Sequence, residues 1–296
     1  MKSFARTALC ACLALMTFAA AHAEVNVWFQ PQKPFRIYGN SYYVGTRGLS
    51  AILIVSPQGM VLIDATAPEN AAQIEANIKA LGFRLSDVKV ILNSHAHFDH
   101  AGAMATLVRD TGARVEASEA GAKALMLGGK DPEDPQYGEA PSFAPISQVS
   151  VVDDGGVVRL GDLAITAHYT PGHTPGATTW TWQSCEAGQC ENMVYADSLG
   201  PFAADGFRFS DAAHPQRVAN YLRGIDLIAA LPCDILISPH PDQSDFLGRV
   251  ERRDAGMQPN PLIDTGACRA YAASGKTRLE ARLAKEKAEA GGKATH

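Results

Sequence analysis

Three histidines and an aspartate lie within six residues of one another, in the run Asn93-Ser94-His95-Ala96-His97-Phe98-Asp99-His100. Because alternate residues of an extended chain point to the same side, His95 and His97 can bind one metal ion together. Asp99 and His100 come where the chain turns into an expected helix, so they can face a second ion from another direction. Structural zinc sites usually close with four protein ligands, often cysteine, whereas catalytic sites use histidine and carboxylate and leave a position for water. The run therefore predicts a catalytic metal site.

Two more histidines occur in similar surroundings. His173 lies in a Pro-Gly-His-Thr-Pro-Gly loop and His240 in a Ser-Pro-His-Pro loop, each directly after an expected strand. Asp197 and Ser198 follow another expected strand. Loops at the carboxyl ends of strands build the active sites of open sheets, so we expect these loops to meet the histidine run. Two histidines without a clustered partner in the sequence are interpreted as structural: His168 and His214.

The segments that must position these loops alternate between strand and helix patterns. Four β-rich runs precede the first expected helix, and the strand expected over residues 88–92 leads directly into the histidine run. So many hairpin-linked strands disfavour a doubly wound parallel sheet. The pattern predicts an α+β fold, an αββα sandwich in which two mixed sheets pack face to face with helices on the outer faces. The expected strands are 35–38, 41–44, 51–56, 60–64, 88–92, 113–117, 148–152, 157–160, 163–168, 178–183, 192–196 and 234–238, and the expected helices are 68–81, 101–111, 215–231 and a surface helix over 276–296 that frays at Gly291-Gly292.

A long loop is expected over residues 128–145, which are rich in glycine, proline and acidic residues. Such a loop can border a binding site, and a simple linker is the alternative.

The composition of the 296-residue chain excludes several classes of function. Hydrophobic residues make up 46% of the chain and charged residues 19%, which allows a sizeable core and differs from a disordered chain. The formal net charge is -5, and no run of lysine or arginine offers a local attraction to phosphate or anionic lipid. We therefore expect no nucleic-acid partner.

The first 23 residues have the pattern of a secretory signal peptide. Lys2 and Arg6 precede an apolar stretch over residues 7–20, and Ala21-His22-Ala23 is a small-x-small cleavage pattern. A transmembrane anchor is the alternative, but the apolar stretch is shorter than a span requires. A lipoprotein reading of Leu9-Cys10-Ala11-Cys12 would leave too short an apolar region before the cut. We expect cleavage before Glu24, with residues 24–296 forming a single catalytic domain in the periplasm and no membrane association after cleavage.

Four cysteines then remain in the mature chain, in a compartment that permits disulfides. Three pairings are open. We favour Cys185 with Cys190, which closes a short turn, and Cys233 with Cys268, which ties a late strand to the C-terminal segment. Four free thiols are the alternative, and the absence of CxxC spacing disfavours a zinc ribbon.

These motifs together resemble the metallo-β-lactamase superfamily over essentially the whole mature chain. The resemblance rests on the HxHxDH run, the two later histidine loops and the strand ending in Ala-Asp-Ser-Leu. Finer features are similar to the third subclass of class B β-lactamases: the all-histidine and aspartate ligand set, Ala196-Asp197-Ser198-Leu199, Leu231-Pro232-Cys233-Asp234 and Ala267-Cys268-Arg269-Ala270-Tyr271.

The resemblance implies two zinc ions per chain and a ligand set for each. His95, His97 and His173 match the ligands of the first zinc, and Asp99, His100 and His240 match those of the second. The implied activity is hydrolysis of the β-lactam amide bond of penicillins, cephalosporins and carbapenems by a zinc-bound hydroxide, which confers antibiotic resistance. Asp99 would also orient the hydroxide as a catalytic residue. We expect a monomer whose partner is a small β-lactam substrate.

Substrate recognition transfers less completely. Ser198 matches a position that contacts the substrate carboxylate in relatives, and its alternative role is that of a turn residue. Gly200 stands where relatives carry a second hydroxyl, so part of that contact is missing or comes from elsewhere.

Rival functions share the fold. Thioesterases of the glyoxalase II type use an aspartate to bridge both metals, and Asp197 could play this part. Export and disulfides disfavour a glutathione thioester as the substrate. Another exported hydrolase, such as a lactonase, and a non-catalytic metal-binding module are the remaining alternatives.

Overall fold

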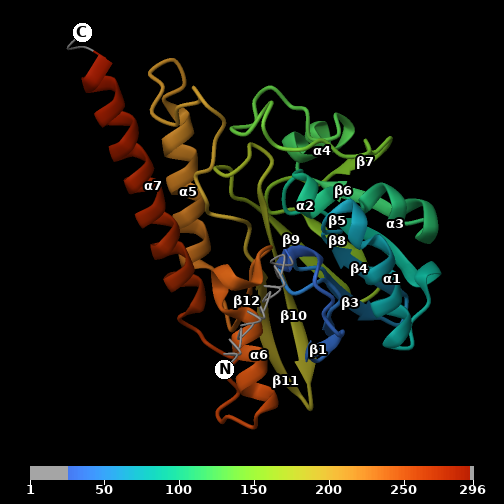
Figure 1. Ribbon diagram of the computed structural model, residues 1–296. Helices are drawn as coiled ribbons and strands as arrows, with labels where there is room; N and C mark the ends of the chain where they lie inside the picture. Colours follow the sequence, from blue (N-terminus) through green and yellow to red (C-terminus); the bar gives the residue numbers. More distant parts are fainter. Residues whose placement is uncertain (1–25, 294–296) are drawn as a thin grey trace, which may run out of the picture.

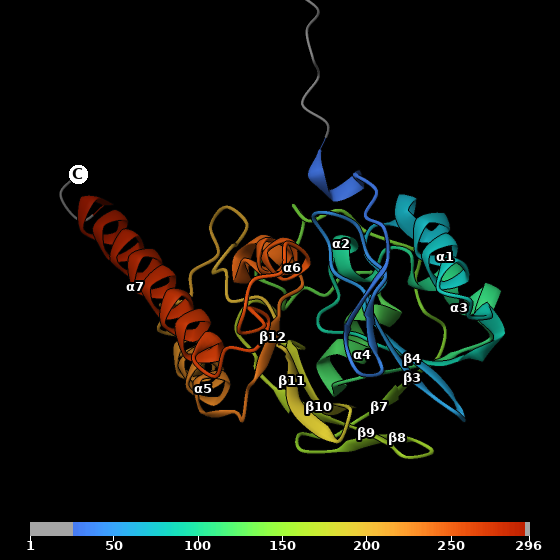
Figure 2. The ribbon, with the colours of Figure 1, turned by 90° about the horizontal axis from the view of Figure 1, so that it is seen from below.

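Two mixed β-sheets lie face to face in the computed structural model, which describes residues 26–293 (Figure 1). One sheet has seven strands in the order β1-β2-β3-β4-β5-β6-β7, and the other has five in the order β12-β11-β10-β9-β8. In Figure 2, α5 and α7 lie on one side of the pair of sheets, and α1 and α3 lie on the other. The expected αββα sandwich is confirmed. The expected signal peptide lies outside the described residues.

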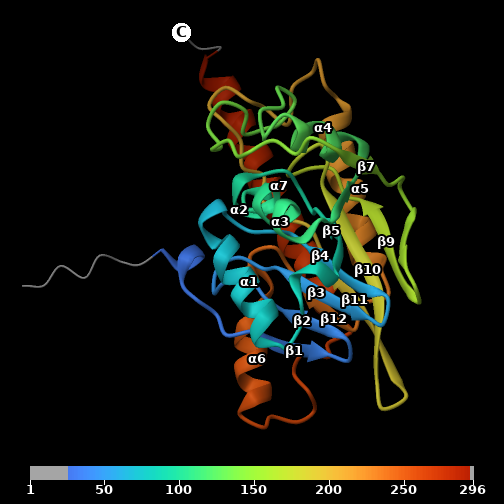
Figure 3. The same ribbon diagram turned by 90° about the vertical axis from the view of Figure 1, so that its right-hand side faces the viewer.

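The seven-stranded sheet changes from antiparallel to parallel pairing at β4. The first four strands pair through hairpin-like connections, whereas β5, β6 and β7 each run parallel to the preceding strand. Parallel neighbours need crossover connections, and helices that cover the outer face supply them (Figure 3). The elements are β1 (Phe35–Tyr38), β2 (Ser41–Tyr43), β3 (Ile52–Ser56), β4 (Gly59–Ile63), α1 (Ala71–Ala80), β5 (Val88–Leu92), α2 (Phe98–Ala101), α3 (Met104–Thr111), β6 (Arg114–Ala117), α4 (Glu119–Met126) and β7 (Val149–Val151), with short 3-10 turns at Val27–Phe29, Pro68–Asn70 and Leu85–Asp87.

The five-stranded sheet is an antiparallel meander with one parallel edge strand. β8 to β11 pair in sequence order, and β12 pairs parallel to β11 after the crossover through α5. Helices α5 and α7 pack on each other and on the outer face of this sheet. The elements are β8 (Val157–Leu160), β9 (Leu163–Tyr169), β10 (Thr178–Glu186), β11 (Gln189–Tyr195), α5 (Gln216–Ala230), β12 (Ile235–Ile237), α6 (Phe246–Asp254) and α7 (Ala267–Lys293), with a 3-10 turn at Pro241–Ser244.

The main core lies between the two sheets and reaches the histidine run. Trp180 of β10 is fully buried there among aliphatic side chains of both sheets. Its indole Nε1 donates a hydrogen bond of 3.0 Å to the carbonyl oxygen of Asn93, directly after β5. Burying an aromatic side chain of this size contributes about 1.5–3 kcal/mol. The core therefore holds the start of the histidine run at a defined place.

Both favoured disulfides are present in the structure. Cys185 and Cys190 are directly opposite residues of the β10–β11 hairpin, so their bond closes the end of that hairpin. Cys233 and Cys268 join the segment before β12 to the first turn of α7.

The helices differ from the expectation in several places. The helix expected over 101–111 is divided into α2 and α3, because the Ala103 amide donates to the carbonyl oxygen of Thr66 instead of continuing the α2 ladder. Gly102 allows this approach, since a Cβ there would come within 2.3 Å of Pro68 Cδ. Helices α4 and α6 were not expected. Helix α7 begins at Ala267 rather than at residue 276, and it continues to Lys293, past the glycines where fraying was expected.

The helices between residues 26 and 293 include none that combines the length and apolar character needed to cross a lipid bilayer.

Candidate metal centre

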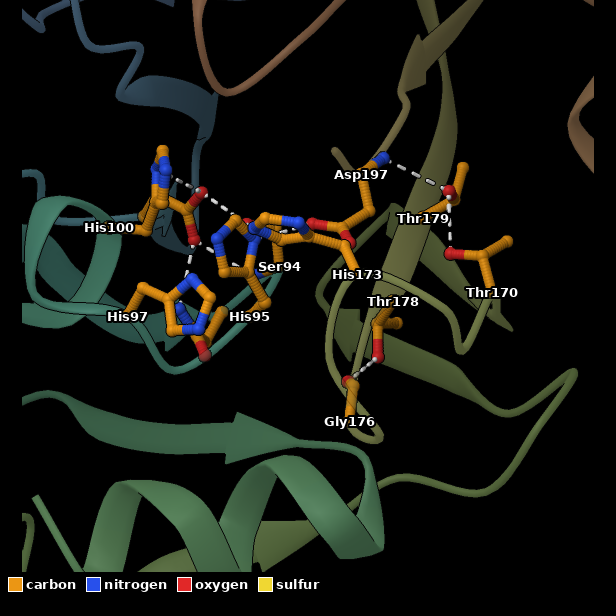
Figure 4. Close-up of polar contacts among 12 residues, drawn as sticks. Ser94, His95, His97, His100, Thr170, His173, Gly176, Thr178, Thr179 and Asp197 are labelled. Atoms are coloured by element: carbon orange, nitrogen blue, oxygen red, sulfur yellow. Dashed lines mark hydrogen bonds and ion pairs between the residues drawn. The ribbon is translucent and has the colours of Figure 1, made fainter. Parts of the chain in front are cut away.

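The three histidines that the sequence assigns to a first metal ion lie together. His95 and His97 follow β5, and His173 lies in the loop between β9 and β10. One donor atom of each lies within 4.8 Å of the other two, and all three residues are buried. The rings meet at interplanar angles between 81° and 88°, so their edges converge (Figure 4). The ring nitrogens carry their lone pairs at these edges, which is the arrangement that a shared metal ion requires.

A separate acceptor orients each of these rings. His95 Nδ1 lies 2.7 Å from Asp197 Oδ1, and His173 Nδ1 lies 2.7 Å from the carbonyl oxygen of Gly200. His97 Nε2 lies 3.1 Å and 3.2 Å from the two carboxylate oxygens of Asp134. An acceptor on one ring nitrogen places the proton there and leaves the other nitrogen with its lone pair free for a metal.

The residues of this cluster fit a metal ion. His95 Nε2 is buried and has no hydrogen-bond partner among the described residues. A buried nitrogen of this kind would cost free energy if it stayed unpaired, because it has lost its bonds to water. Three imidazoles are also a common ligand set of catalytic zinc. The uncompensated lone pair is therefore explained when His95, His97 and His173 share a cation.

A second cluster lies beside the first. Asp99 Oδ2 lies 3.2 Å from His100 Nε2 and 3.3 Å from His240 Nε2, and the two ring nitrogens are 3.2 Å apart. Asp99 and His100 stand at the start of α2, whereas His240 directly precedes the 3-10 turn after β12. The structure therefore brings together all six residues that the sequence selected, in two groups of three.

Burial keeps two histidines of the first cluster, His95 and His173, neutral. Burial and the neighbouring imidazoles lower the pKa of His95 well below its usual range, and burial is the main cause that lowers the pKa of His173 to about 3. Burial alone would raise the pKa of Asp99, but His100 and His240 hold that pKa well below its usual range. Near neutral pH His95 and His173 are therefore neutral and Asp99 is ionised, which are the protonation states of metal ligands.

The buried carboxylate of Asp64 fixes the chain directly after β5. Asp64 Oδ1 accepts a hydrogen bond from the Ser94 amide at 2.8 Å, and Oδ2 accepts from the Ser94 hydroxyl at 2.6 Å and from Tyr195 at 2.8 Å. His100 Nδ1 is 3.8 Å from the same oxygen. Burial raises the pKa of Asp64 and of Asp197, so each needs a positive charge nearby to ionise. Bound cations would supply that charge.

Both clusters open into one cleft of about 530 Å³. Ser198 lines this cleft, and its buried Oγ has no hydrogen-bond partner among residues 26–293. Gln136 of the long loop lines it too, whereas the side chain of Tyr137 is half exposed. The residues around the opening are Trp28, His97, Phe98, Asp99, Gln136, Glu139, Ala140, Pro141, His173, Ser198, Phe202, His240, Asp242 and Gln243. The loop of residues 128–145 therefore borders the centre and is not a simple linker.

The remaining expected residues take distinct places. Gly200 uses its carbonyl to hold His173, and a Cβ at Gly200 would lie 2.4 Å from the ring of Phe202. His168 lies outside both clusters and its Nε2 is 2.8 Å from the Thr181 hydroxyl. His214 also lies outside the clusters, in a separate surface depression.

Sequence reasoning missed the two acids Asp64 and Asp134. Asp64 is distinguished by its backbone, because its φ of 61° places a non-glycine residue in the left-handed region directly after a strand. Such strain is frequent at functional sites, but it becomes visible only in a structure. Asp134 lies in a loop with several other acids and carried no distinguishing signal.

Comparison with known proteins agrees with this geometry. A family model described as the metallo-β-lactamase superfamily matches residues 44–240. The chain belongs to the metallo-β-lactamase superfamily. Solved structures of this superfamily match nearly the whole described chain, which confirms the resemblance to the third subclass. MEM-A1, a subclass B3 metallo-β-lactamase from a soil metagenome library, is 52% identical, with a TM-score of 0.86 over 88% of this chain and 99% of that one.

Other proteins are similar to a lesser degree. The metallo-β-lactamase MIM-1 from Novosphingobium pentaromativorans is 43% identical, with a TM-score of 0.83 over 89% of this chain and 94% of that one. A probable metallo-hydrolase of Burkholderia pseudomallei is 33% identical over 117 residues, and a hydroxyacylglutathione hydrolase of Anaeromyxobacter dehalogenans is 31% identical over 232 residues. These two matches cover 39% and 78% of this chain but span only 37% and 65% of the relatives' own lengths.

Proposed function

We propose that this protein is a zinc-dependent β-lactamase that hydrolyses the amide bond of penicillins, cephalosporins and carbapenems. Two adjacent ligand triads that open into one cleft carry the proposal. The similarity to subclass B3 enzymes supports the choice of substrate, because identity reaches 52% over 99% of a solved B3 structure. Antibiotic resistance would follow from this activity.

The proposed ligand sets are those that the geometry groups. His95, His97 and His173 would hold one zinc ion, and the triad of Asp99, His100 and His240 would hold the other. Zinc at such a site lowers the pKa of bound water towards neutrality and polarises a carbonyl group. A count of two metal ions per chain in the purified protein would support this assignment, and a count of one would restrict it to a single triad.

The chain's own residues can position the reactants. Asp99 contacts His100 and His240 through Oδ2, which leaves Oδ1 to orient a water molecule in the cleft and to take its proton. The unpaired Ser198 hydroxyl can donate a hydrogen bond to a substrate carboxylate. Gly200 has no side chain, so the second hydroxyl of relatives is absent at this position. The ring of Phe202 lies beside Gly200 instead. The walls of the cleft would exclude bulk water from the β-lactam ring of a bound substrate.

A thioesterase of the glyoxalase II type is the second candidate, and curated hydroxyacylglutathione hydrolases are similar to this chain. Its bridging aspartate would have to be Asp197. The two triads formed by the described residues do not include Asp197. Its Oδ1 instead lies 2.7 Å from His95 Nδ1. This orientation favours the β-lactamase.

We also propose that the protein is exported through a signal peptide of residues 1–23 and that it is a monomer. The two disulfides support an oxidising compartment such as the periplasm.

One set of assays tests the activity. The zinc-loaded protein is given a carbapenem, a cephalosporin and an acyl-glutathione thioester, with and without a chelator. We expect chelator-sensitive turnover of both β-lactams, loss of that turnover in His95→Ala and near-normal turnover in His214→Ala. Turnover of the thioester alone would replace the proposal by the second candidate, and chelator-resistant β-lactam hydrolysis would contradict the metal centre.

A further inference from the structure

The loop of residues 128–145 contacts the first triad through one side chain. Both carboxylate oxygens of Asp134 lie within 3.2 Å of His97 Nε2, and both side chains are 7% exposed. His97 therefore has its second nitrogen, Nδ1, for the metal. Asp134 contacts the ring at Nε2 and not at the nitrogen left for a metal, so it is a positioning residue and not a ligand.

The same carboxylate also shapes the loop. Asp134 Oδ1 accepts a hydrogen bond of 2.7 Å from the Gln136 amide, and the Asp134 carbonyl accepts one of 3.0 Å from the Tyr137 amide. Two residues further on, the Glu139 amide donates to the carbonyl of Gln136. Gln136 and Glu139 line the cleft. The wall of the cleft thus depends on the carboxylate that orients His97.

The loop is also joined to the segment of residues 198–205, whose Ser198 and Phe202 line the same cleft. The Pro135 carbonyl accepts a hydrogen bond of 2.8 Å from the Ala204 amide, and Glu139 Oε1 accepts one of 2.7 Å from the Asp205 amide. Upstream of Ala204, the Gly200 carbonyl holds His173. Each of these two segments is therefore bonded to one histidine of the first triad, and the two segments are bonded to each other.

We propose that Asp134 couples metal binding at the first triad to the order of the loop that lines the substrate cleft. A cation held at Nδ1 of His97 would draw electron density from the ring, and the Nε2 proton would then be a stronger donor to the carboxylate. The strengthened bond holds Asp134 in place and, with it, the amides of Gln136 and Tyr137. By reciprocity an ordered loop must favour metal binding by the same factor. This inference rests on the metal sites of the proposed function and does not require that the substrate is a β-lactam.

The test compares two variants with a matched control. Asp134→Asn keeps the shape and one acceptor oxygen but removes the charge, and Asp134→Ala removes the contact. Asp131→Asn is the control, because Asp131 is a buried carboxylate of the same loop that accepts from the Glu133 amide and pairs with Lys123. Two readouts are used on the full-length protein: zinc affinity by competition with a chelator, and hydrogen exchange of the loop amides with and without zinc.

The expected outcomes separate coupling from a general effect on the loop. We expect Asp134→Ala to weaken zinc binding about 10- to 100-fold, Asp134→Asn to weaken it less, and Asp131→Asn to leave it unchanged. In the wild type, zinc should slow hydrogen exchange of the Gln136 and Tyr137 amides by about the same factor as the loss of zinc affinity in Asp134→Ala. In Asp134→Ala, even saturating zinc should not slow the exchange of these amides.

Unchanged zinc affinity in both Asp134 variants, or an equal loss in Asp131→Asn, would overturn the coupling. A wild-type protein that binds zinc tightly but shows no zinc-dependent protection of the loop would overturn it too. A wild type that binds no zinc at the first triad would instead contradict the proposed function.

Discussion

Asp197 and His95 form a fully buried pair, in which carboxylate Oδ1 lies 2.7 Å from ring Nδ1. The carboxylate can hold the ring proton on Nδ1, so that Nε2 faces the other two histidines of the triad with a free lone pair. The backbone of Asp197 is held as well, since its amide donates to the Thr179 hydroxyl and its carbonyl accepts from Tyr271. The loop after β11 therefore orients a histidine of the first triad through Asp197.

Replacement of Asp197 by asparagine should weaken the first metal site. The amide keeps an acceptor for His95 Nδ1 but lacks the negative charge that raises the basicity of the ring, so we expect zinc affinity to fall about 10- to 100-fold. Chelator competition measures this change. Asp234→Asn is the matched control, because Asp234 is a carboxylate remote from the centre that accepts from the amide and side chain of Asn192. Equal affinities in the Asp197 variant and the control would show that the pair plays no part in metal binding.

Ser198→Ala should change substrate binding without changing stability. The Ser198 hydroxyl has no partner among the described residues, so its removal breaks no hydrogen bond there. A hydrogen bond to a charged group is worth about 1.5–3 kcal/mol, which corresponds to a rise in KM of roughly 10- to 100-fold for a substrate with a carboxylate. We expect kcat to change little. Steady-state kinetics with a carbapenem measures the split. A lower kcat at constant KM would instead place Ser198 at the reacting bond.

The two disulfides should differ in their effect on stability. Cys233–Cys268 closes a separation of 35 residues and Cys185–Cys190 one of only 5. Loss of the longer crosslink should lower the free energy of unfolding by about 4 kcal/mol, against about 2 kcal/mol for the shorter one. Urea unfolding of the two paired Cys→Ser variants measures both values. If the Cys185–Cys190 variant lost more stability, the two crosslinks would not act mainly by restricting the unfolded chain.

Glu286 of α7 should make the stability depend on pH below its unfolded pKa of 4.5. Burial alone would raise the pKa of Glu286, but Arg282 and the donors of Phe209 and Ser210 outweigh it and lower that pKa. Its folded-state pKa is thus below the unfolded value. The stabilisation is therefore complete above about pH 5 and is lost as the pH falls through the folded-state pKa.

The variant Glu286→Gln isolates this effect. In chelator-treated protein we expect it to be about 1.5–3 kcal/mol less stable than the wild type at pH 7, and we expect the gap to narrow below pH 4.5. Glu280→Gln, on the exposed face of the same helix, serves as the control. A gap that stays constant down to pH 3 would mean that the charge of Glu286 contributes nothing.

The six residues of the triads could be predicted because their local patterns are strong. Four of them stand in one run after a strand, and His173 and His240 lie in stiff Pro/Gly loops after strands. The acids Asp64 and Asp134 could not be predicted. The chain has 31 aspartates and glutamates, and these two lie 30 and 37 residues from the partners they hold. Only the fold, and not the sequence, distinguishes Asp64 and Asp134 from the other acidic residues.

All twelve strands were expected, but some bounds differ: β10 continues to Glu186 and β11 begins at Gln189, where the expected strands ended at 183 and began at 192. Helix α6 shows why two helices were missed. Helix α6 is amphipathic, but it has only nine residues and five of them are charged, which is more typical of an exposed segment. Arg249 is nevertheless buried, and its guanidinium donates to the carbonyl oxygen of Leu236 at 2.7 Å. Tertiary contacts of this kind override the local signal. For α4 the cap at Ser118 was a usable signal, but Gly121 within the first turn obscured it.

Helix α7 carries Tyr271, whose hydroxyl holds the carbonyl of Asp197, and a Cβ at Gly275 would lie 2.7 Å from Leu199. The first triad therefore reaches its final geometry only after a segment that is synthesised later than all six ligands has docked. During vectorial synthesis the histidine run emerges long before this helix, so the nascent chain passes through a period with ligands but no rigid centre. Because metal binding and folding are linked, high zinc affinity should arise at the end of assembly rather than at its beginning.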